Sequence, residues 1–238
     1  MKNVAVIGSG QMGNGIAHVF AQSGFQVTLI DINQDALNKA VATIDKNLER
    51  QVGKNLISAE DKNTALARIT STTDMAAGVK NAELVVEAAT ERIDLKLQIF
   101  QDLDKYTNEN CILASNTSSI SITKIASVTK RGDKVIGMHF MNPVPVMKLV
   151  EIINGYSTSS AVTKTIFDLS VKLGKSPVEV NDYPGFIANR ILMPMINEAI
   201  YSLYEGVAGV SEIDTVMKLG MAHPMGPLQL ADFIGLDT

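Results

Sequence analysis

The chain has 238 residues, of which 46% are hydrophobic and 19% charged, so it is neither disordered nor fibrous and can bury a sizeable core. A net charge of -4 provides no general attraction to nucleic acid or to an anionic membrane. The apolar run at the N-terminus stops at Gly8, too soon for a signal peptide, and no apolar stretch reaches the roughly 18 residues of a membrane span. With Cys111 as the single cysteine, we expect a soluble cytoplasmic protein that handles small molecules.

Short apolar runs alternate with helical patterns over most of the chain. The apolar runs predict strands at 4–7, 26–30, 84–88, 111–115, 135–140, 146–153 and 178–181. Amphipathic patterns predict helices at 12–23, 36–52, 59–68, 94–104 and 158–173. This alternation predicts an α/β fold, a Rossmann-like doubly wound and mostly parallel sheet with helices on both faces.

The pattern changes at the turn sequence Asp182-Tyr183-Pro184-Gly185, after which only helices are predicted, at 186–205, 210–219 and 226–236. We therefore expect a first domain at 1–183 and a smaller all-helical domain at 184–238. The last predicted helix has apolar residues on more than one face and no glycine cap before Thr238. We expect a truncated chain whose second domain lacks its final helices.

A glycine-rich loop follows the first predicted strand and opens the first predicted helix. It fits the pattern G-x-G-x-x-G, and Asp31 ends the next strand 18 residues after Gly13. Such a loop places a dinucleotide pyrophosphate at a helix N-terminus, and the acid accepts hydrogen bonds from the ribose of NAD while repelling the 2′-phosphate of NADP. A strand–turn–helix that binds nothing, or a loop for FAD or S-adenosylmethionine, would look similar. The candidate cofactor contacts in the loop are Gly8, Ser9, Gly10, Gln11, Met12 and Gly13.

The three histidines differ in their surroundings. His18 lies inside the first helix and is interpreted as structural, and His223 lies in a loop with no assigned role. His139 ends a strand, where open α/β sheets bind ligands, and Glu151 lies in an otherwise apolar strand. A buried carboxylate needs a partner, so the two side chains are predicted to meet and to fix the imidazole tautomer. The alternative is a core histidine and a glutamate on an exposed edge.

Two further polar positions are candidates for the same edge of the sheet. Asn116-Thr117-Ser118-Ser119 follows a predicted strand, although ordinary turn and capping chemistry would also explain it. Asn189 lies early in the long helix after Pro184, and its alternative is a polar residue facing solvent. No set of residues suggests a metal site.

These residues resemble a known family, the short-chain 3-hydroxyacyl-CoA dehydrogenases, and closely the bacterial 3-hydroxybutyryl-CoA dehydrogenases. The resemblance extends over nearly the whole chain, and the stretch HFMNPVPVMKLVEII at 139–153 contains its highly specific part, HFMNPVPVMKLVE. The other stretches are GSGQMGNG at 8–15, ELVVEAATE at 83–91, SNTSS at 115–119, PGFIANR at 184–190 and PMGP at 224–227.

The resemblance implies a role for each matching position. It implies that His139 is the general acid or base, that Glu151 orients it, and that Ser118 and Asn189 hold the substrate oxygen. The positions implied to lie near the nicotinamide of NAD are Glu91 and Lys96 at its ribose and Asn116 beside the ring, and Ser118 is implied as a further cofactor contact. The positions implied to meet the CoA part of an acyl-CoA substrate are Asn47, Lys54 and Ser118.

The resemblance also bears on the assembly and on rival functions. The family's chains continue beyond the sequence DFIGLDT, and the missing helical part would complete the second domain and the contact of a homodimer.

A β-hydroxyacid dehydrogenase would use a lysine after the nucleotide domain, and 186–216 contains none. A crystallin-like structural relative is the non-enzymatic alternative, against which His139, Glu151, Ser118 and Asn189 argue.

Overall fold

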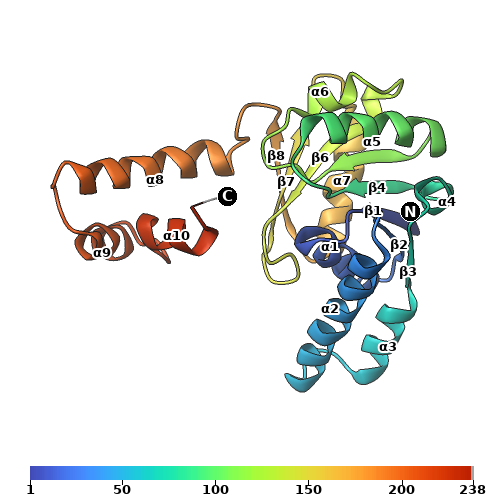
Figure 1. Cartoon of the computed structure of the whole chain (residues 1–238), viewed down its shortest axis with the longest axis horizontal. Helices are drawn as coiled ribbons and strands as arrows, with labels where there is room; N and C mark the ends of the chain where they lie inside the picture. The colour runs from blue at the N-terminus through green and yellow to red at the C-terminus, as the bar shows by residue number, and fades with distance from the viewer. Residues whose placement is uncertain (237–238) are drawn as a thin grey trace. The chain divides into compact units, whose positions relative to one another are not determined.

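The computed structural model describes residues 1–236 and divides the chain into two compact units, the first spanning Met1–Pro184 and the second beginning at Gly185. The first unit contains an eight-stranded sheet of order β3-β2-β1-β4-β5-β6-β7-β8, in which only β6 and β7 pair antiparallel (Figure 1). The strands are β1 (Asn3–Ile7), β2 (Gln26–Ile30), β3 (Ile69–Thr72), β4 (Leu84–Glu87), β5 (Ile112–Ser115), β6 (Val135–Phe140), β7 (Leu149–Asn154) and β8 (Ser176–Asn181).

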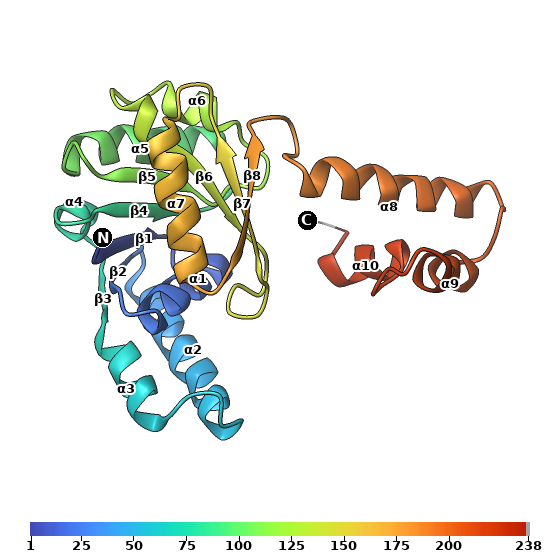
Figure 2. The same ribbon diagram turned by 180° about the vertical axis from the view of Figure 1, so that it is seen from behind.

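Helices cover both faces of this sheet, with α5 in front of it in Figure 1 and α7 in front of it in Figure 2. The helices of the first unit are α1 (Gln11–Gln22), α2 (Gln34–Gly53), α3 (Ala59–Ala67), α4 (Met75–Val79), α5 (Ile93–Tyr106), α6 (Ile122–Ala126) and α7 (Ser160–Lys172), with a short 3₁₀ turn at Gly132–Lys134. A capping box formed by Ser58 and Asp61 opens α3. The doubly wound fold predicted from the alternating pattern is therefore confirmed.

The strands are continuously apolar because they are buried on both sides. Val4 and Val6 of β1 belong to one large core with Ile16 and Phe20 of α1. The residue between them, Ala5, points to the opposite face and is also fully buried. This two-sided burial leaves the strand ends as the places where polar side chains can gather.

The second unit is helical, as predicted, and consists of α8 (Ala188–Tyr204), α9 (Val210–Gly220) and α10 (Pro227–Ile234). The carboxylate of Asp214 on α9 accepts hydrogen bonds from the N–H groups of Leu228 and Gln229, both at 2.9 Å, and so holds the start of α10. Within residues 1–236, no helix is long and apolar enough to cross a membrane.

The short elements β3, α4 and α6 were not predicted, and most predicted boundaries differ from the observed ones by one to three residues. The exposed edge strand β3 has one apolar residue, and α4 and α6 are too short to show a helical period. The strand expected at 146–153 begins only at Leu149, because the N–H groups of Val146 and Met147 both bond to the carbonyl of Pro143. The last helix ends at Ile234 and not at 236, and the expectation of no glycine cap was wrong, since Gly235 follows it with φ +97°.

Candidate active site

The glycine-rich loop connects the carboxyl end of β1 to α1. Gly8 has φ +94°, and a Cβ there would lie 2.5 Å from the carbonyl oxygen of Ala88, so this position requires glycine. A Cβ at Gly13 would lie 1.8 Å from the carbonyl oxygen of Gly8, which lets α1 start directly against the strand. At Gly10 a Cβ would meet no atom within 4 Å, so the space over this residue is open to a ligand.

The first turn of α1 presents backbone N–H groups at this loop. The helix starts at Gln11, and the N–H of Asn14 bonds to the carbonyl of Gly10 at 2.9 Å. The N–H groups of Gln11 and Met12 lie in the first turn, where a helix has no intrahelical acceptor for them. Together with the positive end of the helix dipole, they form a place suited to a phosphate.

Asp31 follows β2 and faces the glycine-rich loop. Its Oδ2 accepts hydrogen bonds from the backbone N–H of Ser9 at 2.8 Å and from the Ser9 hydroxyl at 2.7 Å, and its Oδ1 accepts one from the N–H of Asn33 at 3.1 Å. Burial acts to raise the pKa of Asp31, but these hydrogen bonds outweigh it and hold the pKa below its usual value. The carboxylate is therefore ionised at neutral pH, and Ser9 fixes its position.

A cavity of about 500 Å³ opens between this loop, the end of β2 and α5. Its walls include the apolar side chains of Ile32, Met75, Leu95 and Ile99, a lining that suits a flat heterocycle such as adenine. Sequence reasoning singled out none of these four residues, because they are ordinary apolar residues until the fold brings them together. The open space over Gly10, the ionised Asp31 and this cavity fit the dinucleotide NAD.

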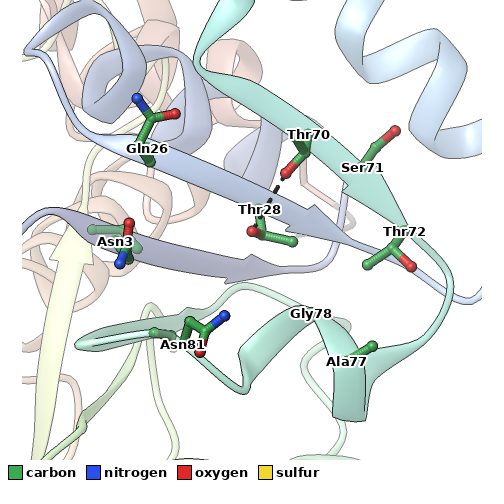
Figure 3. A pocket seen from close by; sticks show the side chains of 11 residues that line it. Asn3, Gln26, Thr28, Thr70, Ser71, Thr72, Ala77, Gly78 and Asn81 are labelled. Carbon is green, nitrogen blue, oxygen red and sulfur yellow. Dashed lines mark hydrogen bonds between the residues drawn. The ribbon is translucent and has the colours of Figure 1, made fainter.

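A second groove, of about 400 Å³, lies over the first residues of β1 and β2, β3 and α4 (Figure 3). Its lining is polar but contains no charged side chain, and Thr70 donates a hydrogen bond to Thr28 at 3.4 Å within it. We assign this groove no chemical role.

His139 and Glu151 meet across the antiparallel pair of strands, where they are directly opposite in register. The His139 Nδ1 lies 2.8 Å from Glu151 Oε2, and both residues are buried, at 6% and 2% exposure. The imidazole Nε2 lies 3.1 Å from the hydroxyl of Ser118, which belongs to the loop after β5. A carboxylate accepts hydrogen bonds only, so Nδ1 carries the proton and Nε2 is left to accept one.

Three successive residues at the end of β5 and in the loop after it form hydrogen bonds with neighbouring segments. Ser115 donates its hydroxyl to Glu87 Oε2 at 2.6 Å, and Asn116 Oδ1 accepts the backbone N–H of Phe140 at 2.9 Å. Thr117 donates its hydroxyl to Glu91 Oε1. Asn116 therefore holds the end of β6, next to His139, rather than facing solvent.

A buried ion pair lies at the carboxyl end of β4. Glu87 is fully buried and accepts hydrogen bonds from Lys96 Nζ at 2.6 Å and from the backbone N–H of Ala89 at 2.7 Å. Lys96, at 1% exposure, also lies 3.4 Å from Glu91 Oε2. Sequence reasoning missed Glu87, although an acid within the apolar run LVVEA was a signal of the same kind as Glu151.

Lys175, just before β8, was also missed. Its buried Nζ donates hydrogen bonds to the carbonyl oxygens of Val144 and Met147, the second at 2.7 Å, and so holds the loop between β6 and β7. Burial, helped by the charge of Lys148, lowers the pKa of Lys175 to about 8. Lys175 therefore supports the loop that connects the strands of His139 and Glu151.

Asn47 and Lys54 lie outside this cluster of strand ends. Asn47 lies near the end of α2 and Lys54 directly follows that helix, which packs against α1 and α3. Asn189 belongs to the second unit, as the second residue of α8. Their functional roles stay predictions. Among residues 1–236 no group of His, Cys, Asp and Glu side chains could hold a metal ion.

This sheet, its dinucleotide-binding loop and a His–Glu pair at the strand ends define the class of protein, an NAD-dependent dehydrogenase. Residues 3–183 match the family model of the 3-hydroxyacyl-CoA dehydrogenase NAD binding domain, and residues 185–238 match that of the C-terminal domain. The chain therefore belongs to the 3-hydroxyacyl-CoA dehydrogenase family, and its cofactor is NAD.

Individual relatives agree with this assignment. The chain is 52% identical to a 3-hydroxybutyryl-CoA dehydrogenase of Bradyrhizobium diazoefficiens over 238 residues, which are 100% of this chain and 81% of the relative. It is 46% identical over 243 residues to the human mitochondrial hydroxyacyl-coenzyme A dehydrogenase, covering 100% of this chain and 77% of that one. The crystal structure of (S)-3-hydroxybutyryl-CoA dehydrogenase from Ralstonia eutropha superposes with a TM-score of 0.97 at 52% identity, over 100% of this chain and 84% of that one.

Proposed function

We propose that this protein interconverts 3-hydroxybutyryl-CoA and acetoacetyl-CoA, with His139 as the general acid and base. The observation that carries the proposal is the placement of His139 between the carboxylate of Glu151 and the hydroxyl of Ser118. The names of the relatives support this choice of substrate, because relatives that are about 50% identical in sequence to this chain are named 3-hydroxybutyryl-CoA dehydrogenase.

In the oxidation, the imidazole removes the proton of the 3-hydroxyl group. Nε2 of His139 accepts this proton as the C3 carbonyl forms, and the imidazolium then carries its charge next to Glu151 at 2.8 Å. The carboxylate thus stabilises the charge that develops in the reaction and keeps the ring in one tautomer. In the reduction, the imidazolium returns the proton to the C3 oxygen.

NAD supplies the acceptor for the hydride that leaves C3 of the substrate. The chain's own residues bind and orient the two reactants: the glycine-rich loop and Asp31 hold the dinucleotide, with Glu91 and Lys96 at its nicotinamide ribose and Asn116 beside the ring. Orientation of this kind can lower a barrier by about 7–11 kcal/mol. Ser118 and Asn189 hold the substrate oxygen, and Asn47 and Lys54 meet the CoA part.

The experiment is an assay of NADH oxidation with acetoacetyl-CoA. The wild-type chain should consume NADH, and His139→Gln should lower kcat by a factor on the order of 10² or more with nearly unchanged NADH affinity. Glu151→Gln should also lower kcat, and the double variant should lose little more than His139→Gln alone, because the residues act as a unit. A fully active His139→Gln enzyme would contradict the mechanism.

The second unit is proposed to complete the substrate cleft and to form a homodimer contact. Large apolar side chains on it are exposed, such as Leu219 at 81%, Phe233 at 74% and Val207 at 72%. Light scattering should therefore report a dimer or larger assemblies, and a stable monodisperse monomer would refute the dimer. A cytoplasmic location and a role in fatty acid or butyrate metabolism belong to the same proposal.

A further inference from the structure

The polar side chains around Lys96 form a closed ring of contacts. Lys96 Nζ donates to Glu87, Glu87 accepts the hydroxyl of Ser115, and the Ser115 hydroxyl accepts the backbone N–H of Thr117 at 3.2 Å. The Thr117 hydroxyl donates to Glu91, whose other oxygen lies 3.4 Å from Lys96 Nζ. The ring therefore joins the ends of β4 and β5 to the first turn of α5.

The two halves of this ring differ in exposure. Glu87, Lys96 and Ser115 are all buried, at 1% exposure or less, so they form the fixed base of the ring. The Glu91 side chain is 42% exposed. An exposed glutamate ordinarily samples several rotamers, and each rotatable bond that a ligand must fix weakens binding. Here Thr117 contacts one carboxylate oxygen of Glu91 and Lys96 the other.

Hydrogen bonds within its own loop hold the Thr117 hydroxyl in position to donate to Glu91. Its hydroxyl oxygen accepts the backbone N–H groups of Ser119 at 3.3 Å and Ile120 at 3.0 Å, which leaves the hydroxyl proton for Glu91. The direction of that proton is therefore set by the loop and not by solvent. A hydrogen bond to a charged acceptor is also about twice as strong as one between neutral groups.

We propose that Thr117 is a positioning residue that holds the Glu91 carboxylate ready for the nicotinamide ribose of NAD. The proposal rests on the role of Glu91 in the proposed function. Thr117 does not itself touch the reacting atoms; it lowers the cost of ordering Glu91 when the dinucleotide binds. Its substitution should thus weaken cofactor binding much more than it slows the chemical step.

The test is a double-mutant cycle read out by titration of the full chain with NADH in the absence of substrate. Thr117→Val keeps the shape and removes the hydroxyl, and it should raise the Kd for NADH roughly tenfold. Thr117→Ser should recover most of this loss. Glu91→Ala should raise the Kd at least as much, and adding Thr117→Val to Glu91→Ala should have little further effect. Thr129→Val is the matched control and should leave the Kd unchanged. It removes a hydroxyl that donates a hydrogen bond to the backbone carbonyl of Ala126 at 2.9 Å.

Two results would overturn the proposal. Equal effects of Thr117→Val in the presence and absence of Glu91 would show that Thr117 acts through the loop and not through the carboxylate. A lower kcat with an unchanged Kd would show that it serves only Ser118, the next residue. The first result does not depend on turnover, because binding of NADH is measured directly. A wild-type chain that binds NADH but leaves acetoacetyl-CoA unchanged would refute the proposed function alone, and the binding cycle would still test the role of Thr117.

Discussion

Replacing Lys96 by Met should destabilise the first unit, because it leaves a carboxylate buried without its cation. The side chains of Lys96 and its partner Glu87 are 1% and 0% exposed, and Lys96 Nζ lies 2.6 Å from Glu87 Oε1. Removal of one partner of such a pair costs about 3–5 kcal/mol. Glu87 keeps two donors, the N–H of Ala89 at 2.7 Å and the hydroxyl of Ser115 at 2.6 Å, so we expect the lower end, about 3 kcal/mol.

The assay is urea unfolding followed by far-ultraviolet circular dichroism, since the chain has no Trp to report by fluorescence. Lys62→Met is the matched control, because Lys62 contacts two carboxylates, Asp45 at 2.8 Å and Glu49 at 2.5 Å, that are 50% and 64% exposed. This control should shift the unfolding midpoint much less than Lys96→Met does, since ion pairs to solvent-exposed carboxylates contribute little. The comparison therefore tests burial and not the number of ion pairs.

The double variant Glu87→Gln with Lys96→Met removes both charges together. It should be more stable than Lys96→Met alone, because no isolated charge then remains in the core. A loss of less than about 1 kcal/mol for Lys96→Met, or a double variant less stable than the single one, would refute the reasoning from the buried charge.

Three other changes test the cofactor site and the core. Asp31→Ala should lower the ratio of steady-state kcat/KM with NADH to that with NADPH, because the ionised carboxylate that repels the 2′-phosphate is gone. Gly13→Ala should abolish NADH binding in a titration, since its Cβ would lie 1.8 Å from the carbonyl oxygen of Gly8. Burial lowers the pKa of His18 from 6.5 to about 4, so the unfolded state takes up a proton first as the pH falls. His18 should therefore lower the free energy of unfolding by up to about 1.4 kcal/mol per pH unit as the pH falls from 6.5 to about 4, and His18→Gln should reduce this slope in urea titrations.

Much of the fold could be predicted because its signals are local. The buried strands are apolar on both sides, and the glycine-rich loop lies between a strand and a helix, so both can be recognised from neighbouring residues. The edge strand β3 and the five-residue helices α4 and α6 could not, because exposure or short length removes the periodic pattern. The cavity beside Asp31 was equally hidden, since Met75 and Ile99 come from different elements.

The candidate site could also be predicted only in part. Antiparallel pairing of two neighbouring apolar strands was enough to bring His139 and Glu151 together, because few other partners were available for a buried acid. The roles of Asn47, Lys54 and Asn189 rest on resemblance, because a substrate contact depends on a molecule that the sequence does not contain.

Glu87 and Glu151 illustrate why one buried acid was recognised and the other was not. Each lies in an apolar strand, and the same argument, that an isolated buried charge is costly, applies to both. The partner of Glu151 is a histidine, a residue that already suggests acid–base chemistry. The partner of Glu87 is a lysine in a helix pattern, where a solvated cation is the ordinary expectation, yet Lys96 is 1% exposed. Burial of a charge therefore identifies a constraint, and only the chemistry of its partner distinguishes a reacting pair from one that holds the site in place.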